Sequence, residues 1–406
     1  MSANLLPMKD EQRISLIQQE MRERGLDAIV CALPSNVLLL SGYWPVVGTS
    51  MAIALSDGQI MLIVPEDEQT LAARGRAAEI VTFRPDSLAH MTTAAEAIRG
   101  PLRKMAAGLG NGIRHLGCDG FEATEPVSYA AMHHYGEALP ALLQYAFPSS
   151  NLIAADDLLM QLRSSKTPPE IHNIRIACQI AERAFRDGAH QLRAGLTELE
   201  AAAIFRLPLS TALLDFPTVE RADGFVSCMS GANSALAAGA YARSRTRRLE
   251  AGDLVLIHCN SYADGYWTDV TRTYSLGAMD DRRRTIYAAV FAARTAAMEV
   301  IRIGAEATDV DRAARGVLVA RGFGAEFKHG TGRGVGHSAI SANALPRLHP
   351  QSTDVLNAGM VFNVEPAIYL DGYGGIRHCD MVALTINGPE LLTPFQCPAD
   401  ELVMEP

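Results

Sequence analysis

One order of elements occurs twice between residues 168 and 385, and it constrains the fold more than any other feature of the sequence. Two helical segments come first, and the apolar strands "FVSCMS", "DLVLIHCN" and "GYWTDVTRTYSL" follow them. Two further helical segments, at about 279–302 and 308–321, precede the strands "GMVFNVEPAIYL" and "GGIRHCDMVAL". The recurrence indicates an internal structural duplication, although residue identity between the halves is low.

The stretch "SSKTPPEIH" holds a strong helix-start signal. Thr167 can cap a helix, Pro168 suits its first position, and Glu170 completes a capping box. A chain of 406 residues is long enough for two domains. We therefore expect an N-terminal domain over residues 1–165 and a larger domain over residues 166–406.

The residues before this boundary predict a compact α/β domain. Residues 10–24 have the apolar spacing of an amphipathic helix. Strands are expected at "DAIVCAL", at "NVLLLSG" and in the hairpin "MAIAL-SDG-QIMLIV", where Asp57 and Gly58 supply the turn. Further strands, at about 79–83 and 115–119, alternate with helical stretches. The fold class of the whole chain is therefore α/β (α+β).

Composition excludes several classes of protein. The net charge of −9 argues against nucleic acid as a partner, and no apolar stretch is long enough to span a membrane. The first residues, "MSANLLPMKDEQ", lack the pattern of an export signal. The seven cysteines form no CxxC pair, which favours reduced thiols and a cytoplasmic protein.

Three stretches hold the residues that could do chemistry: "IHCNSYADGYWTDVTRTY", "KHGTGRGVGH" and "NVEPAIYLDGYGGIRHCD". Together with "SSKTPPEIHNIRIACQIAE" and "SGANSAL", they resemble the creatinase/aminopeptidase P/prolidase superfamily. The resemblance covers most of residues 165–385 and extends more weakly to the N-terminal residues. It implies a small N-terminal α/β domain followed by a C-terminal domain with the pita-bread fold.

In the metallopeptidases of this superfamily, two Asp, one His and two Glu side chains hold two divalent cations. The resemblance implies that Asp269 and Glu365 keep two of these five positions. His258, Arg333 and Cys379 stand at the other three. A guanidinium repels cations and pairs with carboxylates, so Arg333 would take the place of a cation and pair with Asp269 or Glu365.

We therefore expect no metal and no cofactor. One zinc ion on His258, Asp269, Glu365 and Cys379 remains as an alternative, because zinc accepts nitrogen, oxygen and sulfur ligands.

These four residues are also the predicted catalytic group. Cys379 is either a nucleophile whose thiol is made acidic by a nearby arginine or a small thiol that fills space. His258 is either a general base or a polar residue bonded to Asp269. Asp269 and Glu365 are either functional carboxylates or members of an ion pair with Arg333.

A second group of residues is predicted to bind substrate: Arg333, His329, His337, Arg377 and His378. His329 matches a histidine that usually supports the site in the superfamily. The histidines expected to handle substrate are absent, and His337 or His349 could replace them. In a strand, Arg377 and Cys379 point to one face, and His378 points to the other.

The predicted function is a metal-independent, creatinase-like hydrolase of a C–N bond in a small amide, amidine or dipeptide-like substrate. The first alternative is a catalytically inactive pita-bread protein that binds a small ligand or a protein. The second is an Xaa-Pro metallopeptidase with an unusual metal site. The expected partners are a small-molecule or short-peptide substrate and, by the resemblance, a second copy of the chain in a homodimer.

Overall fold

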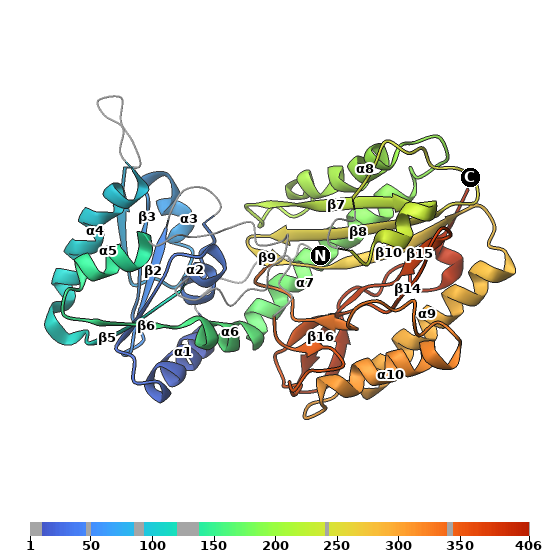
Figure 1. Cartoon of the computed structure of the whole chain (residues 1–406). Coiled ribbons are helices and arrows are strands. Elements are labelled where there is room, and N and C mark those ends of the chain that lie inside the picture. The colour runs from blue at the N-terminus through green and yellow to red at the C-terminus, as the bar shows by residue number, and fades with distance from the viewer. Residues whose placement is uncertain are drawn as a thin grey trace. The chain divides into compact units, whose positions relative to one another are not determined.

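The structure is a computed structural model that describes residues 10–45, 50–84, 93–119, 138–239, 243–338 and 344–405. The described residues before Ser164 form one compact unit, and those from Ser164 onward form a second (Figure 1). We call them the N-terminal and C-terminal units. That residues 1–165 and 166–406 fold as independent domains remains a prediction.

The N-terminal unit is built on one six-stranded sheet with the order β4-β3-β2-β1-β5-β6. β2 pairs antiparallel with β1 and β3, and the other neighbours are parallel. The strands are β1 (Ala28–Cys31), β2 (Met51–Leu55), β3 (Ile60–Pro65), β4 (Glu79–Phe83), β5 (His115–Cys118) and β6 (Asn151–Ala154). The helices are α1 (Glu11–Glu23), α2 (Pro34–Ser41), α3 (Gln69–Ala72), α4 (Ala94–Leu109), α5 (Ala138–Ala146) and α6 (Asp156–Ser164), with short 3-10 turns η1 (Glu66–Glu68) and η2 (Gly110–Gly112).

Apolar side chains cover both faces of this sheet. Ile29 and Cys31 belong to one buried cluster, whereas Ala28 and Val30 belong to another, as strand alternation requires. A sheet buried on both faces has continuous apolar strands, which explains "DAIVCAL" and "QIMLIV".

The predicted strand at "NVLLLSG" is wrong, because these residues form helix α2. A short, wholly buried apolar run has no periodicity that separates a strand from a helix. Pro34 at the first helical position and Gly42 at the C-terminal end, with a φ of 75°, were the signals that could have settled it.

The C-terminal unit repeats one plan twice, as the sequence predicted. The first half holds α7 (Pro168–Ala189), α8 (Glu198–Ser210), β7 (Ala222–Ser230), β8 (Leu254–Ala263), β9 (Tyr266–Trp267) and β10 (Val270–Leu276), with η3 (Ala212–Leu214) and η4 (Gly231–Leu236). The second half holds α9 (Asp281–Val300), α10 (Ala307–Ala320), β11 (Gly332–Arg333), β12 (Arg347–Leu348), β13 (Val361–Val364), β14 (Ala367–Leu370), β15 (Gly374–Arg377), β16 (Asp380–Thr385), β17 (Gly388–Leu391), η5 (Ala399–Leu402) and β18 (Val403–Met404).

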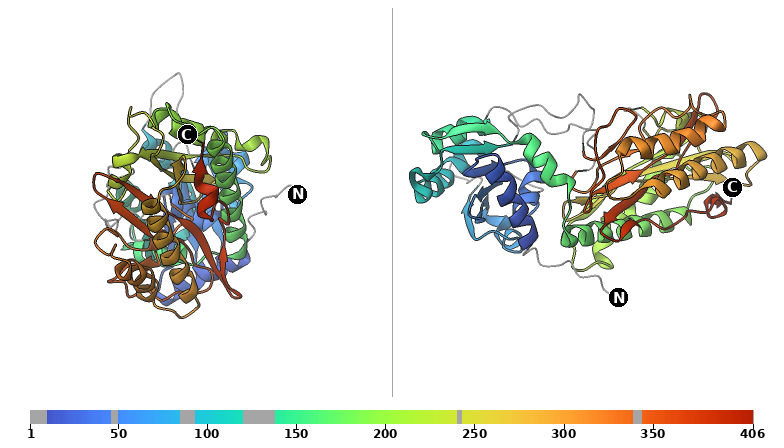
Figure 2. Two further views of the ribbon diagram at one scale, coloured as in Figure 1. Left: turned by 90° about the vertical axis from the view of Figure 1, so that its right-hand side faces the viewer. Right: turned by 90° about the horizontal axis from the view of Figure 1, so that it is seen from below.

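The strands of the two halves meet in the middle of this unit, and the helix pairs pack against them (Figures 1 and 2). One sheet has the order β18-β10-β8-β7 with β9 on β8, and the smaller sheets are β13-β16-β17, β14-β15 and β11-β12. Single bridges join them, from Thr271 to Cys379 and from Gly334 to Phe362. Residues far apart in sequence are therefore held side by side where the halves meet.

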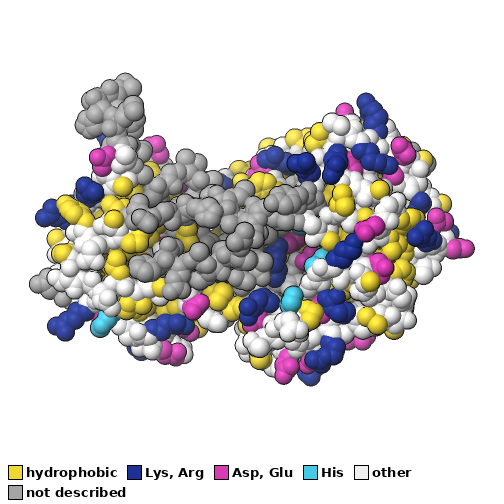
Figure 3. All heavy atoms as spheres, in the orientation of Figure 1, with side chains coloured by type: hydrophobic (Ala, Val, Ile, Leu, Met, Phe, Trp, Pro, Cys, Tyr) yellow, Lys and Arg dark blue, Asp and Glu magenta, His cyan; other side chains and the backbone are white. Residues whose placement is uncertain are grey.

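Within the part of the chain that the structure describes, no helix combines the length and apolarity needed to cross a membrane. On the face shown in Figure 3, Lys and Arg side chains lie among Asp and Glu side chains on both units.

Candidate functional site

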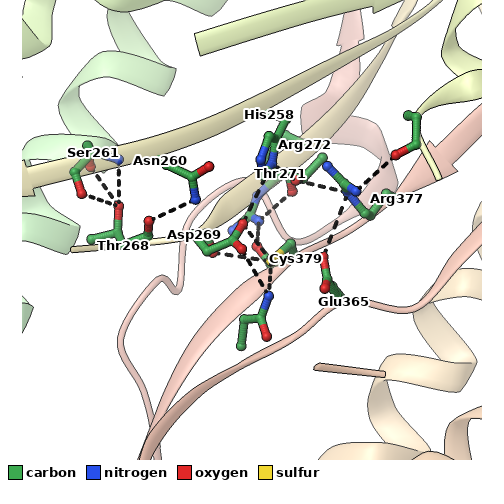
Figure 4. Close-up of polar contacts among 12 residues, drawn as sticks. His258, Asn260, Ser261, Thr268, Asp269, Thr271, Arg272, Glu365, Arg377 and Cys379 are labelled. Atoms are coloured by element: carbon green, nitrogen blue, oxygen red, sulfur yellow. Dashed lines mark hydrogen bonds and ion pairs between the residues drawn. The ribbon is translucent and has the colours of Figure 1, made fainter. Parts of the chain in front are cut away.

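The four predicted catalytic residues lie together at the junction of the two halves (Figure 4). His258 is on β8, and Asp269 immediately precedes β10. Glu365 is in the connection between β13 and β14, and Cys379 is in the connection between β15 and β16. Backbone hydrogen bonds in both directions, of 3.1 and 3.3 Å, tie Cys379 to Thr271 of β10. The single strand predicted through "GGIRHCD" is thus interrupted at the site.

Asp269 is at the centre of the cluster. It is bonded to Arg333, for which Asp269 and Glu365 were the two predicted partners. Nη2 of Arg333 donates to Oδ2 of Asp269 over 2.7 Å, and Nδ2 of Asn363 donates to the same oxygen over 3.2 Å. Burial by itself would raise the pKa of this carboxyl, but the guanidinium groups of Arg333 and Arg377 lower it below its ordinary value. Asp269 is therefore ionised, and its Oδ1, which Arg333 does not use, lies 3.6 Å from Nδ1 of His258.

Cys379 lies beside that remaining oxygen. Its sulfur is 3.7 Å from Oδ1 of Asp269 and donates to the backbone oxygen of Asp269 over 3.2 Å. Burial, with the charges of Asp269 and Glu365, raises the pKa of the thiol well above its ordinary value. The side chain is wholly buried, so it has neither the acidity nor the access that a nucleophilic thiol needs.

His258 is neutral in this environment. Burial and the charge of Arg377 lower the pKa of its ring to about 4. Nε of Arg377 donates to the Thr271 hydroxyl over 3.1 Å, and that hydroxyl is 3.0 Å from Nδ1 of His258. The Thr271 hydroxyl thus links the His258 ring to Arg377.

Arg377 and His329 border the cluster on its other side. Nε of Arg377 is 4.0 Å from Glu365, and its Nη1 is 3.4 Å from the Tyr369 hydroxyl. Nε2 of His329 is 3.0 Å from the same hydroxyl, and its Nδ1 is 2.8 Å from the backbone oxygen of Gly330. His329 therefore contacts the site through Tyr369, and its supporting role stays a prediction.

Two residues predicted to bind substrate are not in the cluster. His337 is buried, with Nε2 3.6 Å from Glu170 at the start of α7. His378 points to the opposite face from Cys379, with Nε2 3.2 Å from Asp380. The histidines in "KHGTGRGVGH" and "GGIRHCD" show that a sequence motif does not distinguish a substrate-binding histidine from one that packs in the protein core.

Beneath the cluster, Asp380 forms a buried charge network. Oδ1 accepts from Nη2 of Arg272 over 2.8 Å and from the Thr393 hydroxyl over 2.9 Å. Oδ2 accepts from Nε of Arg294 and faces His378. Burial alone would raise the pKa of this carboxyl, yet Arg272 and His378 hold it well below its ordinary value. This network fixes the strand connection that carries Cys379.

Three residues of the site were missed in the sequence: Thr271, Asn363 and Tyr369. Thr271 could have been found, since it lies two residues after Asp269 and therefore on the same face of an extended chain. Asn363 and Tyr369 gave no such signal, because their roles depend on pairing between strands that only the fold specifies.

Gly332 sets the position of Arg333. A Cβ atom at Gly332 would lie 1.9 Å from the backbone oxygen of Asn363, so only glycine lets β11 approach β13 this closely. The Asn363 side chain then accepts a hydrogen bond of 2.7 Å from the Arg333 backbone nitrogen. The close approach of the two backbones thus places the guanidinium at Asp269.

We expect Gly332→Ala to lower the free energy of unfolding by at least about 2 kcal/mol, because β11 must move off β13. The exposed helical Gly316 is the control, since a Cβ there meets no atom within 4 Å. Gly316→Ala should stabilise slightly, by about 0.5 to 1 kcal/mol. Urea unfolding measures both, and equal stability of Gly332→Ala and the parent protein would contradict this account.

Comparison with known proteins identifies the family to which this chain is similar. The sequence model of metallopeptidase family M24 matches residues 172–385, and that of the creatinase/prolidase N-terminal domain matches residues 13–165. An Xaa-Pro dipeptidase from Pyrococcus furiosus is 29% identical over 385 residues, which cover 94% of this chain and 98% of that protein. The crystal structure of the prolidase from Pyrococcus horikoshii OT3 is 26% identical, with a TM-score of 0.73, and the match covers 94% of this chain and 98% of that one. The prolidase structure from P. furiosus is 29% identical, with a TM-score of 0.71 and coverage of 93% and 99%.

These comparisons correct two predictions. The metal-independent, creatinase-like hydrolase is wrong as the main function, because the matching family is one of metallopeptidases and the relatives are Xaa-Pro dipeptidases and prolidases. The absence of a cofactor is wrong for the same reason. Both predictions gave the lost ligand positions and the charge of Arg333 more weight than the alternative of one zinc ion on His258, Asp269, Glu365 and Cys379.

Other predictions are confirmed. The α/β (α+β) class, with a small N-terminal α/β domain and a C-terminal pita-bread domain, agrees with the matching family models and with the prolidase structures. So does the prediction of a C–N bond hydrolase from the Xaa-Pro peptidase/creatinase superfamily. The family model covers more than half of the sequence, and this chain belongs to metallopeptidase family M24.

Proposed function

We propose that this protein is a peptidase for short peptides of the Xaa-Pro type, with an unusual site that holds one divalent metal ion instead of two. The observation that carries the proposal is the convergence of Asp269, Glu365 and Cys379. One ligand atom from each lies within 4.8 Å of the others. Two relatives with near-complete coverage are Xaa-Pro dipeptidases, which favours dipeptides as substrates.

Two cations do not fit these residues. At the five positions where the superfamily resemblance places metal ligands, three hold His258, Arg333 and Cys379. The Arg333 guanidinium already uses one oxygen of Asp269. A second cation would need the place that the Arg333 guanidinium occupies, and at an effective dielectric constant of about 20 and a separation of about 4 Å the two would repel each other by roughly 8 kcal/mol.

One cation fits better. Zinc–sulfur and zinc–oxygen bonds of about 2.3 and 2.1 Å at a tetrahedral angle put the two ligand atoms about 3.6 Å apart. The sulfur of Cys379 and Oδ1 of Asp269 are 3.7 Å apart, and this is the oxygen that Arg333 leaves free. A cation also favours the thiolate over the thiol, which offsets the raised pKa of Cys379.

A second cluster of ligand atoms, from His378, Asp380 and Cys397, is a poor candidate. Asp380 already pairs there with the guanidinium groups of Arg272 and Arg294. A cation would have to displace both charges.

A bound divalent ion would act as a Lewis acid, polarising a peptide carbonyl and making water a better nucleophile. The residues of the chain would orient the substrate around it. Neutral His258 adds no positive charge to the site. Arg377 holds Thr271 and so fixes the His258 ring.

The test is metal analysis and hydrolysis on the same sample. Protein purified without chelator should contain about one equivalent of divalent metal and should release proline from an Xaa-Pro dipeptide. A chelator should remove both the metal and the activity, and adding the metal back should restore them. Two equivalents would refute the single-metal site, and no hydrolysis by loaded protein would refute the peptidase.

The proposal also covers the localisation, the oligomeric state, the domains and the roles of individual residues. We propose a cytoplasmic homodimer, supported by free thiols at all seven cysteines and by the superfamily resemblance. We also propose that residues 1–165 and 166–406 fold as separate domains. For the predicted residues that the structure brings together, the proposed roles are Asp269, Glu365 and Cys379 as metal ligands, and His258, Arg333 and Arg377 around the substrate.

A further inference from the structure

We propose that the Arg333 guanidinium stands in the position of a second cation and binds the oxygen anion that forms at the scissile carbonyl. This inference rests on the proposed function, because it gives that site its second positive group. It assigns Arg333 a catalytic role that a structural ion pair with Asp269 would not have.

The position of Arg333 is fixed from two sides. Its backbone nitrogen donates to the Asn363 side chain over 2.7 Å, and its Nη2 donates to Asp269 over 2.7 Å. Nδ2 of Asn363 donates to the same oxygen of Asp269. The guanidinium is therefore held in place before any ligand arrives, as electrostatic stabilisation of a transition state requires.

One end of the guanidinium is unused. Nη1 of Arg333 is buried and has no hydrogen-bond partner among the described residues. The side chain as a whole is 15% exposed. A buried donor without an acceptor is unfavourable, and an oxygen atom of a ligand would satisfy it.

The charge of the site favours an anion. Asp269 and Glu365 oppose Arg333 and Arg377, so the formal charge is zero while the Cys379 thiol is protonated. One divalent ion with a Cys379 thiolate raises this charge to +1. A ligand with a single negative charge therefore returns the site to neutrality.

Peptide hydrolysis produces such a charge. As the water oxygen bonds to the carbonyl carbon, the π electron pair moves onto the carbonyl oxygen, which becomes anionic. When that pair returns, the C–N bond breaks, and the proton lost by water ends on the leaving nitrogen. An arginine donor at this oxygen forms a charge-assisted hydrogen bond that the neutral carbonyl of the substrate cannot match.

The experiment compares two non-hydrolysable analogues of one Xaa-Pro dipeptide by calorimetry. The phosphinate analogue carries an anionic PO₂ group at the carbonyl position, and the ketomethylene analogue keeps a neutral carbonyl. Arg333→Gln should weaken binding of the phosphinate about 10- to 100-fold and change binding of the ketomethylene analogue less than about threefold. Arg333→Lys keeps the positive charge but loses the paired donors of the guanidinium. Its affinity for the phosphinate should lie between those of Arg333→Gln and the parent protein.

Arg347→Gln is the matched control. Arg347 pairs with Arg333 across β11 and β12, and it makes its own ion pair with Asp354 over 2.7 Å, away from the site residues. Its loss should leave both affinities unchanged. Equal weakening of the two analogues by Arg333→Gln, or no weakening of the phosphinate, would overturn the inference, as would a parent protein that binds neither.

A second measurement needs no substrate. Arg333→His restores the residue type that the superfamily uses as a ligand at this position and removes the positive charge. Metal content should rise from about one to about two equivalents, and unchanged metal content would refute the stand-in role. If the parent protein fails to hydrolyse Xaa-Pro peptides but shows the Arg333-dependent preference for the phosphinate, the peptidase proposal and the catalytic role of Arg333 fail, and only the anion-binding position at Arg333 stands.

Discussion

Protein carrying Cys379→Ala should purify with almost no divalent metal and should lose at least about a hundredfold of its activity on Xaa-Pro dipeptides. The substitution removes the only soft ligand of the proposed site and leaves two carboxylates, one of which is already paired with Arg333. Elemental analysis and steady-state kinetics on one preparation measure the two effects.

Cys178→Ala separates loss of the ligand from loss of a buried thiol. Cys178 is as buried as Cys379 but lies on α7, outside the cluster. This control should keep its metal and its activity and lose only a little stability. A full equivalent of metal in Cys379→Ala protein would show that the ligand set is wrong.

The largest effect on stability should come from Asp380→Asn, which we expect to lower the free energy of unfolding by about 3 to 5 kcal/mol. The neutral amide leaves the guanidinium groups of Arg272 and Arg294 in the protein interior without their shared anion. Urea unfolding at neutral pH measures the difference.

The pH dependence gives this prediction a second readout. The native pKa of Asp380 is lowered, so its contribution is complete above the unfolded pKa of about 3.9 and is lost as the pH falls towards the native value. The gap between the parent and Asp380→Asn should therefore shrink below about pH 4.

Asp371→Asn is the surface control, because Asp371 pairs with Lys328 and its side chain is 83% exposed. It should change stability by less than about 0.5 kcal/mol. A similar, small decrease in the free energy of unfolding in both variants would contradict the stabilising role of the buried network around Asp380.

Local signals predicted much of the fold. The capping box of Thr167 and Glu170 is formed at the start of α7, and the repeated order of helices and strands is present in both halves. These features depend on residues close together in sequence. Helix α2 was missed because a short buried apolar run has the same composition in a helix and in a strand.

The site was predicted only where alternation or the resemblance fixed a position. Arg333 was expected beside Asp269 or Glu365, and it pairs with Asp269. The expectation of no metal failed because lost ligand positions and a nearby arginine do not exclude a cation held by a thiol and the remaining carboxylates. The sulfur of Cys379 lies beside the Asp269 carboxylate only because a bridge pairs Cys379 with Thr271, and no sequence pattern shows that contact.

The bridge between Thr271 and Cys379 also links the site to the folding of the chain. Asp269 and Cys379 are 110 residues apart in sequence, and their ligand atoms approach only after the two halves have paired. Bringing them together costs loop-closure entropy, which makes such pairings late events in folding. An ion that needs both residues cannot bind the unfolded chain with comparable affinity, so at saturating concentration it stabilises the joined halves by mass action. Gain of metal would then be a late step of folding, and chelation would loosen the junction of the halves before it loosens either helix pair.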